Sequence, residues 1–317
     1  VPLTGLLMPL ALAATALSYI WMARRRRVYV VSALTAMMAA AVLLITPAWP
    51  DLHQGVLEVT ALDVGQGDSL FVATPQGKTL LVDSGGSLGP AATTFDVGEQ
   101  VVSPFLWSRR IARLDAVAIT HGHADHMGGM RSVVANFRPR EFWTSRAAAG
   151  PALAELVAYA RERGVEVKLM AAGERFSFGG ADVQVLAPAG DWVPTAGAEN
   201  NDSLVLKLTF AGHSALLEGD AERKVERLLA QSAASVDVLK VGHHGSNTST
   251  TPELLAAVHP RFAVITAGKD NRFGYPKPAV LARLQGYGVA TYRTDLEGAV
   301  TFYIDQNGVR PTLPNRR

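Results

Sequence analysis

The chain has one stretch in which four possible metal ligands are crowded together, THGHADHMGGM at residues 120–130. The four are His121, His123, Asp125 and His126. Imidazole nitrogens and carboxylate oxygens suit zinc, manganese or iron, and a loop at a strand end can turn several of them toward one point. A single surface histidine is usually structural, but this spacing predicts a metal site. Because one loop cannot complete two coordination shells, we expect further ligands from other strand ends.

Two later segments contain candidates for the remaining ligands. In LLEGD, residues 216–220, Asp220 follows an expected strand. Its carboxylate can bridge two ions, although the same position suits an aspartate that caps the next helix. In DVLKVGHHGSNTST, residues 237–250, His243 and His244 follow an apolar run. One histidine would bind metal while its neighbour transfers a proton or contacts substrate, and the residues alone leave open which does which.

The residues after the histidine pair are candidates for substrate contact. Ser246, Asn247, Thr248 and Ser249 offer hydroxyl and amide donors that suit a phosphate, and they equally suit an ordinary turn before a helix. Two divalent ions about 4 Å apart would activate a water and hold the attacked centre, which suits hydrolysis of phosphodiesters, esters or amides. One or two divalent ions, zinc or manganese, are therefore the expected cofactor. The chain has no cysteine, so no thiolate ligand is available.

Alternating apolar runs and glycine-rich turns predict the elements that position these side chains. Strands are expected at residues 56–63, 69–73, 79–82, 114–120, 165–170, 181–186, 204–210, 214–217, 236–241, 263–266 and 299–304, and helices at 151–163, 221–231, 251–257 and 277–286. Two strand-rich halves with helices between them predict a layered α/β arrangement with mixed sheets.

The first fifty residues differ from the rest, because they contain no acid and only four basic residues, at 24–27. The uncharged stretches 1–23 and 28–46 are each long enough to cross a hydrocarbon core of about 30 Å. A signal peptide would have one shorter apolar stretch after its basic residues. We therefore predict two transmembrane helices in residues 1–50 and a hydrolase domain in residues 51–317.

The arginine loop at residues 24–27 also predicts an orientation. A short basic loop stays in the cytoplasm, which places the hydrolase domain on the extracytoplasmic side, periplasmic or outer, of the cell membrane. Because the chain begins with Val1 and not with methionine, we expect it to be a piece of a longer protein. Of the 30 Lys and Arg, 26 remain after these four against 28 Asp and Glu, so the net charge gives no sign of nucleic-acid binding.

The spacing His-x-His-x-Asp-His resembles the motif of the metallo-β-lactamase fold superfamily. This resemblance implies an αββα sandwich of two mixed sheets flanked by helices, and it places Asp83 of LLVDSGG behind the metal loop. The metal ligands that it implies are His121, His123, Asp125, His126, Asp220 and His243, with Asp125 and His244 as catalytic residues. The superfamily usually has a further histidine ligand where this chain reads AENNDSLVL, so Asn200 or Asn201 would supply a weaker amide ligand.

Several longer motifs narrow the resemblance. LDVGQGDS (62–69), NNDSLVL (200–206), LLEGD, HHGSNTST and TYRTDLEGAVTF (291–302) resemble the C-terminal domain of ComEC-type DNA-internalisation proteins, in which a membrane channel imports single-stranded DNA during natural transformation. The resemblance implies a metal-dependent nuclease that degrades the strand that is not imported. The implied partners are DNA, the membrane and the preceding channel region of the same protein. The implied substrate contacts are Asp68, Ser246, Asn247 and Asn201, and Asp63 and Asp83 are implied as structural residues near the site.

Other functions stay open on the sequence alone. The domain would equally suit a membrane-tethered hydrolase of another ester, a lactone or a β-lactam, or a non-catalytic part of the channel. Related sequences often have a histidine where this chain has Tyr275. Seven arginines between residues 109 and 146 face only three acidic residues. They would hold phosphates beside the metal loop or form an ordinary solvated face.

Overall fold

The computed structural model describes residues 4–22, 27–45, 50–86, 95–147, 150–194, 199–232 and 234–314. The chain forms two compact units, residues 1–51 and residues 52–317.

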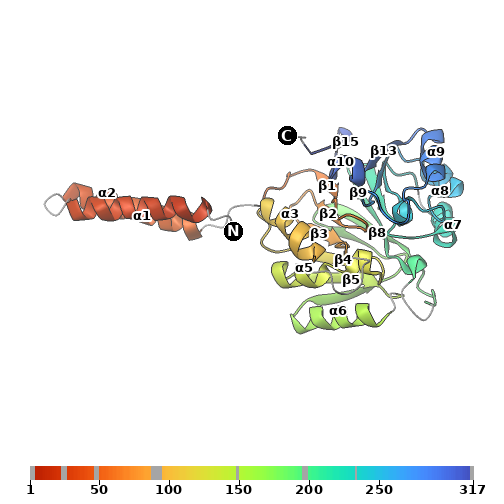
Figure 1. Ribbon diagram of the computed structural model, residues 1–317, viewed down its shortest axis with the longest axis horizontal. Coiled ribbons are helices and arrows are strands. Elements are labelled where there is room, and N and C mark those ends of the chain that lie inside the picture. The colour runs from red at the N-terminus through yellow and green to blue at the C-terminus, as the bar shows by residue number, and fades with distance from the viewer. Residues whose placement is uncertain are drawn as a thin grey trace. The chain divides into compact units, whose positions relative to one another are not determined.

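The first unit consists of two helices, α1 (Thr4–Met22) and α2 (Arg27–Ile45), which pack side by side (Figure 1). Helices thus form where membrane spans were predicted. Among the residues that the structure describes, however, no helix is long and apolar enough to cross a membrane. The prediction of transmembrane helices is therefore not supported, and residues 24–26 of the predicted loop lie outside the described part.

The second unit contains two mixed sheets. The first sheet has eight strands in the order β15-β14-β1-β2-β3-β4-β5-β6. Their bounds are β1 (Leu57–Ala61), β2 (Leu70–Ala73), β3 (Thr79–Val82), β4 (Ala116–Ile119), β5 (Glu141–Ser145), β6 (Glu166–Met170), β14 (Val300–Asp305) and β15 (Gly308–Thr312). Strands β3 to β6 are parallel to one another, and the others pair antiparallel.

The second sheet has seven strands in the order β13-β12-β11-β10-β9-β8-β7. Their bounds are β7 (Arg175–Phe178), β8 (Ala181–Ala187), β9 (Val205–Phe210), β10 (His213–Leu217), β11 (Val238–Lys240), β12 (Phe262–Ile265) and β13 (Ala290–Arg293). Strands β10 to β13 are parallel, and β7 to β10 form antiparallel pairs.

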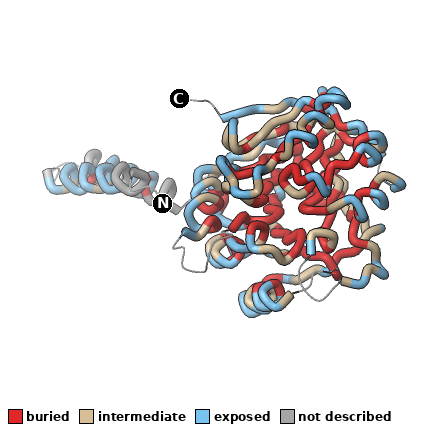
Figure 2. The backbone as a smooth tube through the Cα atoms, turned by 45° about the vertical axis from the view of Figure 1, so that its right-hand side comes forward, coloured by how far each residue is buried: buried red, intermediate tan, exposed pale blue. Residues whose placement is uncertain are grey.

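The hydrophobic core lies in three layers. Side chains such as Trp143, Val185 and Phe302 fill the space between the two sheets. Two further layers join each sheet to the helices on its outer face (Figures 1 and 2). The first sheet carries α3 (Ser103–Ser108), α5 (Met130–Phe137) and α6 (Pro151–Glu162), and the second carries α7 (Arg223–Ser232), α8 (Pro252–Val258) and α9 (Pro278–Gly286). Because both faces of each sheet are covered, central strands are buried on both sides, and β1, β2 and β3 are buried at every residue.

Short helical segments connect these elements near the site. They are η1 (Gly98–Val102), α4 (Ala124–Met127), η2 (Asn200–Asp202), η3 (Gly242–Gly245) and α10 (Thr294–Glu297). Three of them, α4, η2 and η3, carry residues that were predicted to bind metal or substrate.

The predicted α/β sandwich of two mixed sheets flanked by helices is confirmed. Each strand and helix expected from the sequence is present within a few residues of its predicted bounds. Strands β5, β7, β13 and β15 and helices α3, α4, α5 and α10 were not predicted. Parallel strands end at the same edge of their sheet. The loops after β3 and β4 of the first sheet and after β10, β11 and β12 of the second sheet meet at one edge of the sandwich, which carries the candidate site.

Candidate metal centre

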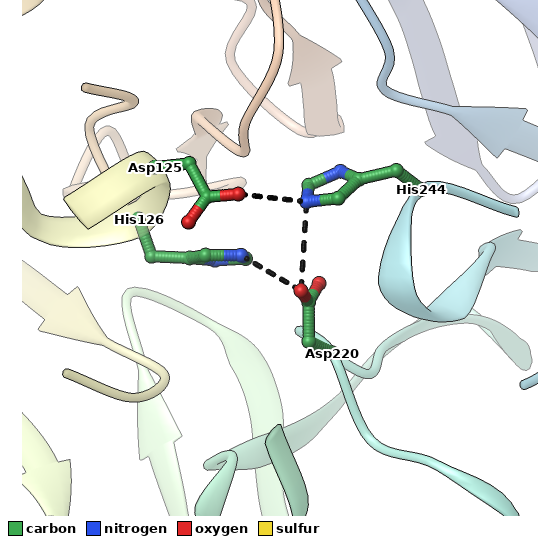
Figure 3. A group of neighbouring side chains, drawn as sticks. All are labelled: Asp125, His126, Asp220 and His244. Atoms are coloured by element: carbon green, nitrogen blue, oxygen red, sulfur yellow. Dashed lines mark ion pairs between the residues drawn. The ribbon is translucent and has the colours of Figure 1, made fainter. Parts of the chain in front are cut away.

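Asp125, His126, Asp220 and His244 form one group at this edge, with a possible ligand atom from each lying within 4.8 Å of the others (Figure 3). Asp125 and His126 lie on α4 after β4, whereas Asp220 follows β10 and His244 follows β11. Asp220 Oδ2 is 3.2 Å from His126 Nε2 and 3.5 Å from His244 Nε2. His244 Nε2 is also 3.5 Å from Asp125 Oδ2. Three loops that are distant in the sequence therefore supply the group.

The other nitrogen of each imidazole is held by an acceptor behind it. His126 Nδ1 donates to Asp83 Oδ2 at 2.8 Å, and His244 Nδ1 donates to the Thr266 carbonyl at 2.9 Å. Asp83 is held in turn, because it accepts hydrogen bonds from the backbone N and the hydroxyl of Thr120. With hydrogen on Nδ1, each Nε2 presents its lone pair to the centre, which is the usual support of a metal-binding histidine.

Three atoms of the group fit a metal ion. The Nε2 atoms of His126 and His244 and the Oδ1 atom of Asp220 are buried and make no hydrogen bond with any described residue. Buried polar atoms in proteins are nearly always hydrogen-bonded, so three exceptions at one point need an explanation. A divalent cation bound by two imidazoles and a carboxylate provides one.

The charges of the group favour cation binding. Burial raises the pKa of the Asp220 carboxyl, but the nearby imidazoles and Lys240 outweigh it and hold that pKa well below the usual value. Burial opposes protonation of His244, yet Asp220 and Asp68 together raise its pKa to about 9. The pKa of His126 is also raised, against burial, by Asp220 and Asp83. A metal ion therefore competes with protons for these two imidazoles.

The metal loop is held by close backbone contacts with two neighbouring turns. The Asp68 N–H donates to the Asp125 carbonyl at 3.1 Å. A Cβ atom at Gly67 would lie 2.2 Å from that same oxygen, and one at Gly86 would lie 1.9 Å from the Ala124 carbonyl oxygen. Only glycine permits this approach, so the glycines around the loop position its ligands.

His121 and His123 lie beside the group but contact each other. His121 Nε2 is 2.9 Å from His123 Nδ1, so one nitrogen donates to the other. His121 is fully buried, with its ring centroid 4.2 Å from that of His126. Burial, together with the nearby His126, lowers the pKa of His121 well below its usual value, which keeps the ring neutral. Their predicted ligand role stays a prediction.

The histidine pair is arranged differently from the expectation that His243 binds metal and His244 acts on substrate. His244 is buried in the group, whereas His243 is partly exposed, and its Nε2 lies 3.8 Å from Asp220 Oδ2. His243 Nδ1 lies 3.1 Å from Glu222 Oε1. Both histidines have positive φ, 48° and 53°, and this turn sends the two side chains in different directions. The geometry therefore favours exchanging the two roles.

Asp68 was predicted to contact substrate, but it is completely buried behind the group. It forms an ion pair with Lys240 and accepts the hydroxyl hydrogen of Thr266, and its Oδ1 is 3.3 Å from His244 Nδ1. Lys240 is completely buried too and donates to the Gly219 carbonyl at 3.0 Å. A side chain enclosed in this way cannot reach a substrate, so Asp68 positions the group. The sequence signal that was missed is a lysine inside the apolar run DVLKV.

The remaining predicted residues are spread around the site. Asp63 is exposed and accepts a hydrogen bond from the Gly65 N–H at 3.3 Å, so it shapes a turn outside the group. Asn201 accepts from the Glu222 N–H at 3.1 Å just before α7. Ser246 is buried and its hydroxyl bonds Thr248, 2.9 Å away, as in an ordinary turn, whereas Asn247 is exposed.

The arginines between residues 109 and 146 are mostly engaged within the protein. The pairs are Arg109 with Glu58, Arg131 with Glu155, Arg140 with Asp115 and Arg146 with Glu174, and Arg113 donates to the Arg138 carbonyl. These contacts favour the alternative of an ordinary protein surface over a phosphate-binding one.

Comparison with known proteins agrees with this geometry. The family model described as "Metallo-beta-lactamase superfamily" matches residues 62–269, a range that includes all four residues of the group.

Two curated relatives are informative. The chain is 34% identical over 256 residues to "ComE operon protein 3" of Bacillus subtilis, covering 77% of this chain and 33% of the relative. It is 30% identical over 255 residues to "Competence protein ComA" of Neisseria gonorrhoeae, covering 80% of this chain and 33% of the relative. The chain thus spans about a third of the length of each.

Among solved structures, the chain is similar to CmlA, "a diiron beta-hydroxylase from Streptomyces venezuelae", with a TM-score of 0.51 and 18% identity. The match covers 85% of this chain and 56% of that one. At this identity the likeness shows the fold alone.

Proposed function

The chain belongs to the metallo-β-lactamase superfamily, and from this premise we propose that residues 52–317 are a metal-dependent nuclease that hydrolyses DNA during its uptake. The observation that carries the hydrolase part is the convergence on Asp220 of the Nε2 atoms of His126 and His244, which are buried and make no hydrogen bond with any described residue. The substrate part rests on the two relatives, one of them named a competence protein. It also rests on the motifs DVGQGDS and HHGS.

Asp125, His126, Asp220 and His244 would hold the first divalent ion, zinc or manganese. Such an ion supplies Lewis acidity and lowers the pKa of water, which is the chemistry that phosphodiester hydrolysis requires. Asp83 and the Thr266 carbonyl keep the two imidazoles in the binding orientation, through the Nδ1 contacts of 2.8 and 2.9 Å. The residues that bind and the residues that orient thus come from both sheets.

His243 is the residue placed to move a proton. It is at the rim, with 19% of its side chain exposed, and its Nδ1 is held by Glu222. The hydrogen bond from His243 lowers the pKa of Glu222, so that carboxylate stays charged and fixes the ring. In hydrolysis, water would lose a proton to solvent and add to phosphorus, and the bond to the leaving oxygen would break. His243 Nε2 would give that oxygen a proton and regain one from solvent.

The proposal extends to the whole protein of which this chain would be a part. The hydrolase unit would act on DNA next to a membrane channel formed by another region of the same protein, and degrade the strand that is not imported. It would lie on the extracytoplasmic side, as the arginine cluster at residues 24–27 predicts. Labelling of that cluster from each side of the membrane tests the orientation, and access from outside would contradict it.

A nuclease assay on the whole 317-residue chain tests the activity. With manganese or zinc, the wild type should degrade linear DNA, and Asp125→Ala or His126→Ala should abolish this. Asp63→Ala is a matched control, because it removes an exposed aspartate outside the group. The proposal fails if the loaded wild type binds metal and leaves DNA intact over a range of ions and pH. Turnover of a lactone or another ester under the same conditions would then identify a different hydrolase.

A further inference from the structure

Beside the metal centre, three partly exposed aromatic rings form a row, and the hydrolytic chemistry does not use two of them. They belong to His243, Tyr275 and Phe273, which are called the ring row below. We propose that the ring row binds the bases of a single-stranded nucleic acid by stacking and leads the strand to the metal centre. The inference rests on the proposed function and names the form of its substrate.

The ring row begins in the site and runs away from it. The ring of His243 meets that of Tyr275 edge-on, with 5.6 Å between centroids and 72° between planes. Tyr275 and Phe273 are nearly parallel, with 5.5 Å between centroids and 16° between planes. Since His243 Nε2 lies 3.8 Å from Asp220 Oδ2, a strand stacked along these rings has its backbone within reach of the metal centre.

The loop that carries the rings is held rigidly. The Asn271 side chain donates to the carbonyls of Gly268 and Tyr275 and accepts from the Tyr275 N–H. The Lys277 N–H donates to the Gly245 carbonyl at 2.9 Å, one residue after His244. The ring row is therefore fixed relative to the metal-binding turn, and little ordering is needed when a strand binds.

Cations lie over the rings of Phe273 and Tyr275. The Arg272 guanidinium is 4.9 Å from the centre of Phe273, and Lys277 Nζ is 5.2 Å from the centre of Tyr275. With Lys269, the loop carries three cations against the single carboxylate of Asp270. Arg272 and Lys269 are exposed. Because Arg272 is exposed, its guanidinium can leave the face of Phe273 to a base and pair with the neighbouring phosphate.

This chemistry distinguishes single strands from duplexes. In a duplex each base is covered by its neighbours, so a protein ring has no base face to contact. In a single strand or a frayed end the faces are available, and stacking on aromatic side chains is tolerant of sequence. The ring row therefore predicts a preference for single-stranded ends, without preference for a base.

The test measures binding to the manganese-loaded, full-length chain by fluorescence anisotropy. The probes are a labelled twelve-nucleotide oligothymidine and an abasic strand of equal length, both with phosphorothioate linkages to slow hydrolysis. Wild type should bind oligothymidine more tightly than the abasic strand. Phe273→Leu keeps an apolar side chain but removes the aromatic face, and Tyr275→Leu does the same. Each should weaken oligothymidine binding roughly tenfold and leave abasic binding unchanged.

Two further variants control for folding and for general charge. Phe273→Tyr keeps the ring and should retain wild-type affinity. Tyr159→Leu removes another partly exposed ring flanked by cations, with Arg131 and Arg163 at 3.9 and 3.5 Å, but on α6, which packs on α5 and β6. It should also bind as wild type does.

The outcomes separate this inference from the proposed function. Equal affinity for oligothymidine and the abasic strand, or unchanged binding by Phe273→Leu, overturns the proposal that the ring row binds bases, even if the chain degrades DNA. Base-dependent binding that Phe273→Leu removes supports the ring row, and the absence of hydrolysis in the same preparation would then overturn only the nuclease.

Discussion

The buried ion pair behind the metal centre allows a quantitative test. Lys240 is completely buried, and its ammonium group pairs with Asp68, donates to the Gly219 carbonyl and lies 3.9 Å from Asp220 Oδ1. Burial lowers the pKa of Lys240, but the carboxylates of Asp68 and Asp220 outweigh it and raise that pKa, so the side chain is charged. Lys240→Met keeps the length of the side chain and removes the charge. Breaking one partner of a buried pair costs about 3–5 kcal/mol, because the other charge is left uncompensated.

Urea unfolding of the metal-free chain measures this cost, since bound metal would add its own stabilisation. The fluorescence of Trp143, which is completely buried between the sheets, reports on the hydrolase unit. Lys207→Met is the matched control. Lys207 lies on β9 of the same sheet and donates to the carbonyls of Ala234 and Ser235. The control should lose less than about 1 kcal/mol.

A double variant tests the reasoning itself. If the cost of Lys240→Met comes from an uncompensated Asp68, then Lys240→Met combined with Asp68→Asn should be less destabilised than the sum of the two single changes, by about 1 kcal/mol or more. A loss below about 1 kcal/mol in Lys240→Met, or strict additivity in the double variant, would refute the assignment of this pair as support of the centre.

Three other predictions follow from the site. The raised pKa of His244, about 9, contributes stability to the metal-free chain that is fully present below about pH 6.5 and is lost as the pH rises through 9. The loss is on the order of 3 kcal/mol, and a series of urea unfolding curves from pH 6 to 10 that showed constant or rising stability would contradict it. His244→Ala should weaken manganese binding more than roughly tenfold, whereas His243→Ala should mainly reduce turnover. Calorimetric titration distinguishes them, and equal affinities would restore His243 as a ligand. Gly86→Ala would place a Cβ 1.9 Å from the Ala124 carbonyl oxygen and should cost at least about 1–3 kcal/mol. At Gly190 an added Cβ would meet no described atom within 4 Å apart from its chain neighbours, so Gly190→Ala should be neutral. Thermal melts of the two variants measure this difference, and a neutral Gly86→Ala would show that the turn can move.

The sequence predicted the elements that are apolar by themselves. Strands such as β4 (AVAI) and β10 (HSALL) lie in the sheet interior, and their composition alone identifies them. Strands β5 (EFWTS) and β7 (RFSF) were missed, because their mixed composition has no clear pattern. Each is a strand because of its hydrogen-bonded neighbours. β5 lies between β4 and β6, which are distant from it in the sequence, and β7 pairs with β8.

The site was predictable as a set of residue types and not as an arrangement. The close spacing of the four possible ligands between His121 and His126 predicts metal binding from the sequence alone. The choice between His243 and His244 depends on two consecutive positive φ angles, which spacing does not determine. The burial of Asp68 depends on Lys240, a partner on a strand of the other sheet. Both points concern the direction in which a side chain points, which tertiary packing decides.

The centre has two halves, one with His126, Asp220 and His244 and one with His121 and His123. They differ in whether their imidazole nitrogens already make hydrogen bonds. At His126 and His244, other groups hold Nδ1, and Nε2 makes no hydrogen bond with any described residue, so an ion that binds there breaks none. At His121 and His123, an ion must first separate two nitrogens that bond each other at 2.9 Å. Where the superfamily usually has a further histidine, this chain has Asn200 or Asn201. Asn200 Nδ2 donates to Glu222, and its Oδ1 is buried without a hydrogen bond among the described residues. An amide oxygen binds a divalent ion more weakly than an imidazole. We therefore predict that the half formed by His126, Asp220 and His244 binds an ion more tightly, and that the other half would gain full coordination only with an additional ligand.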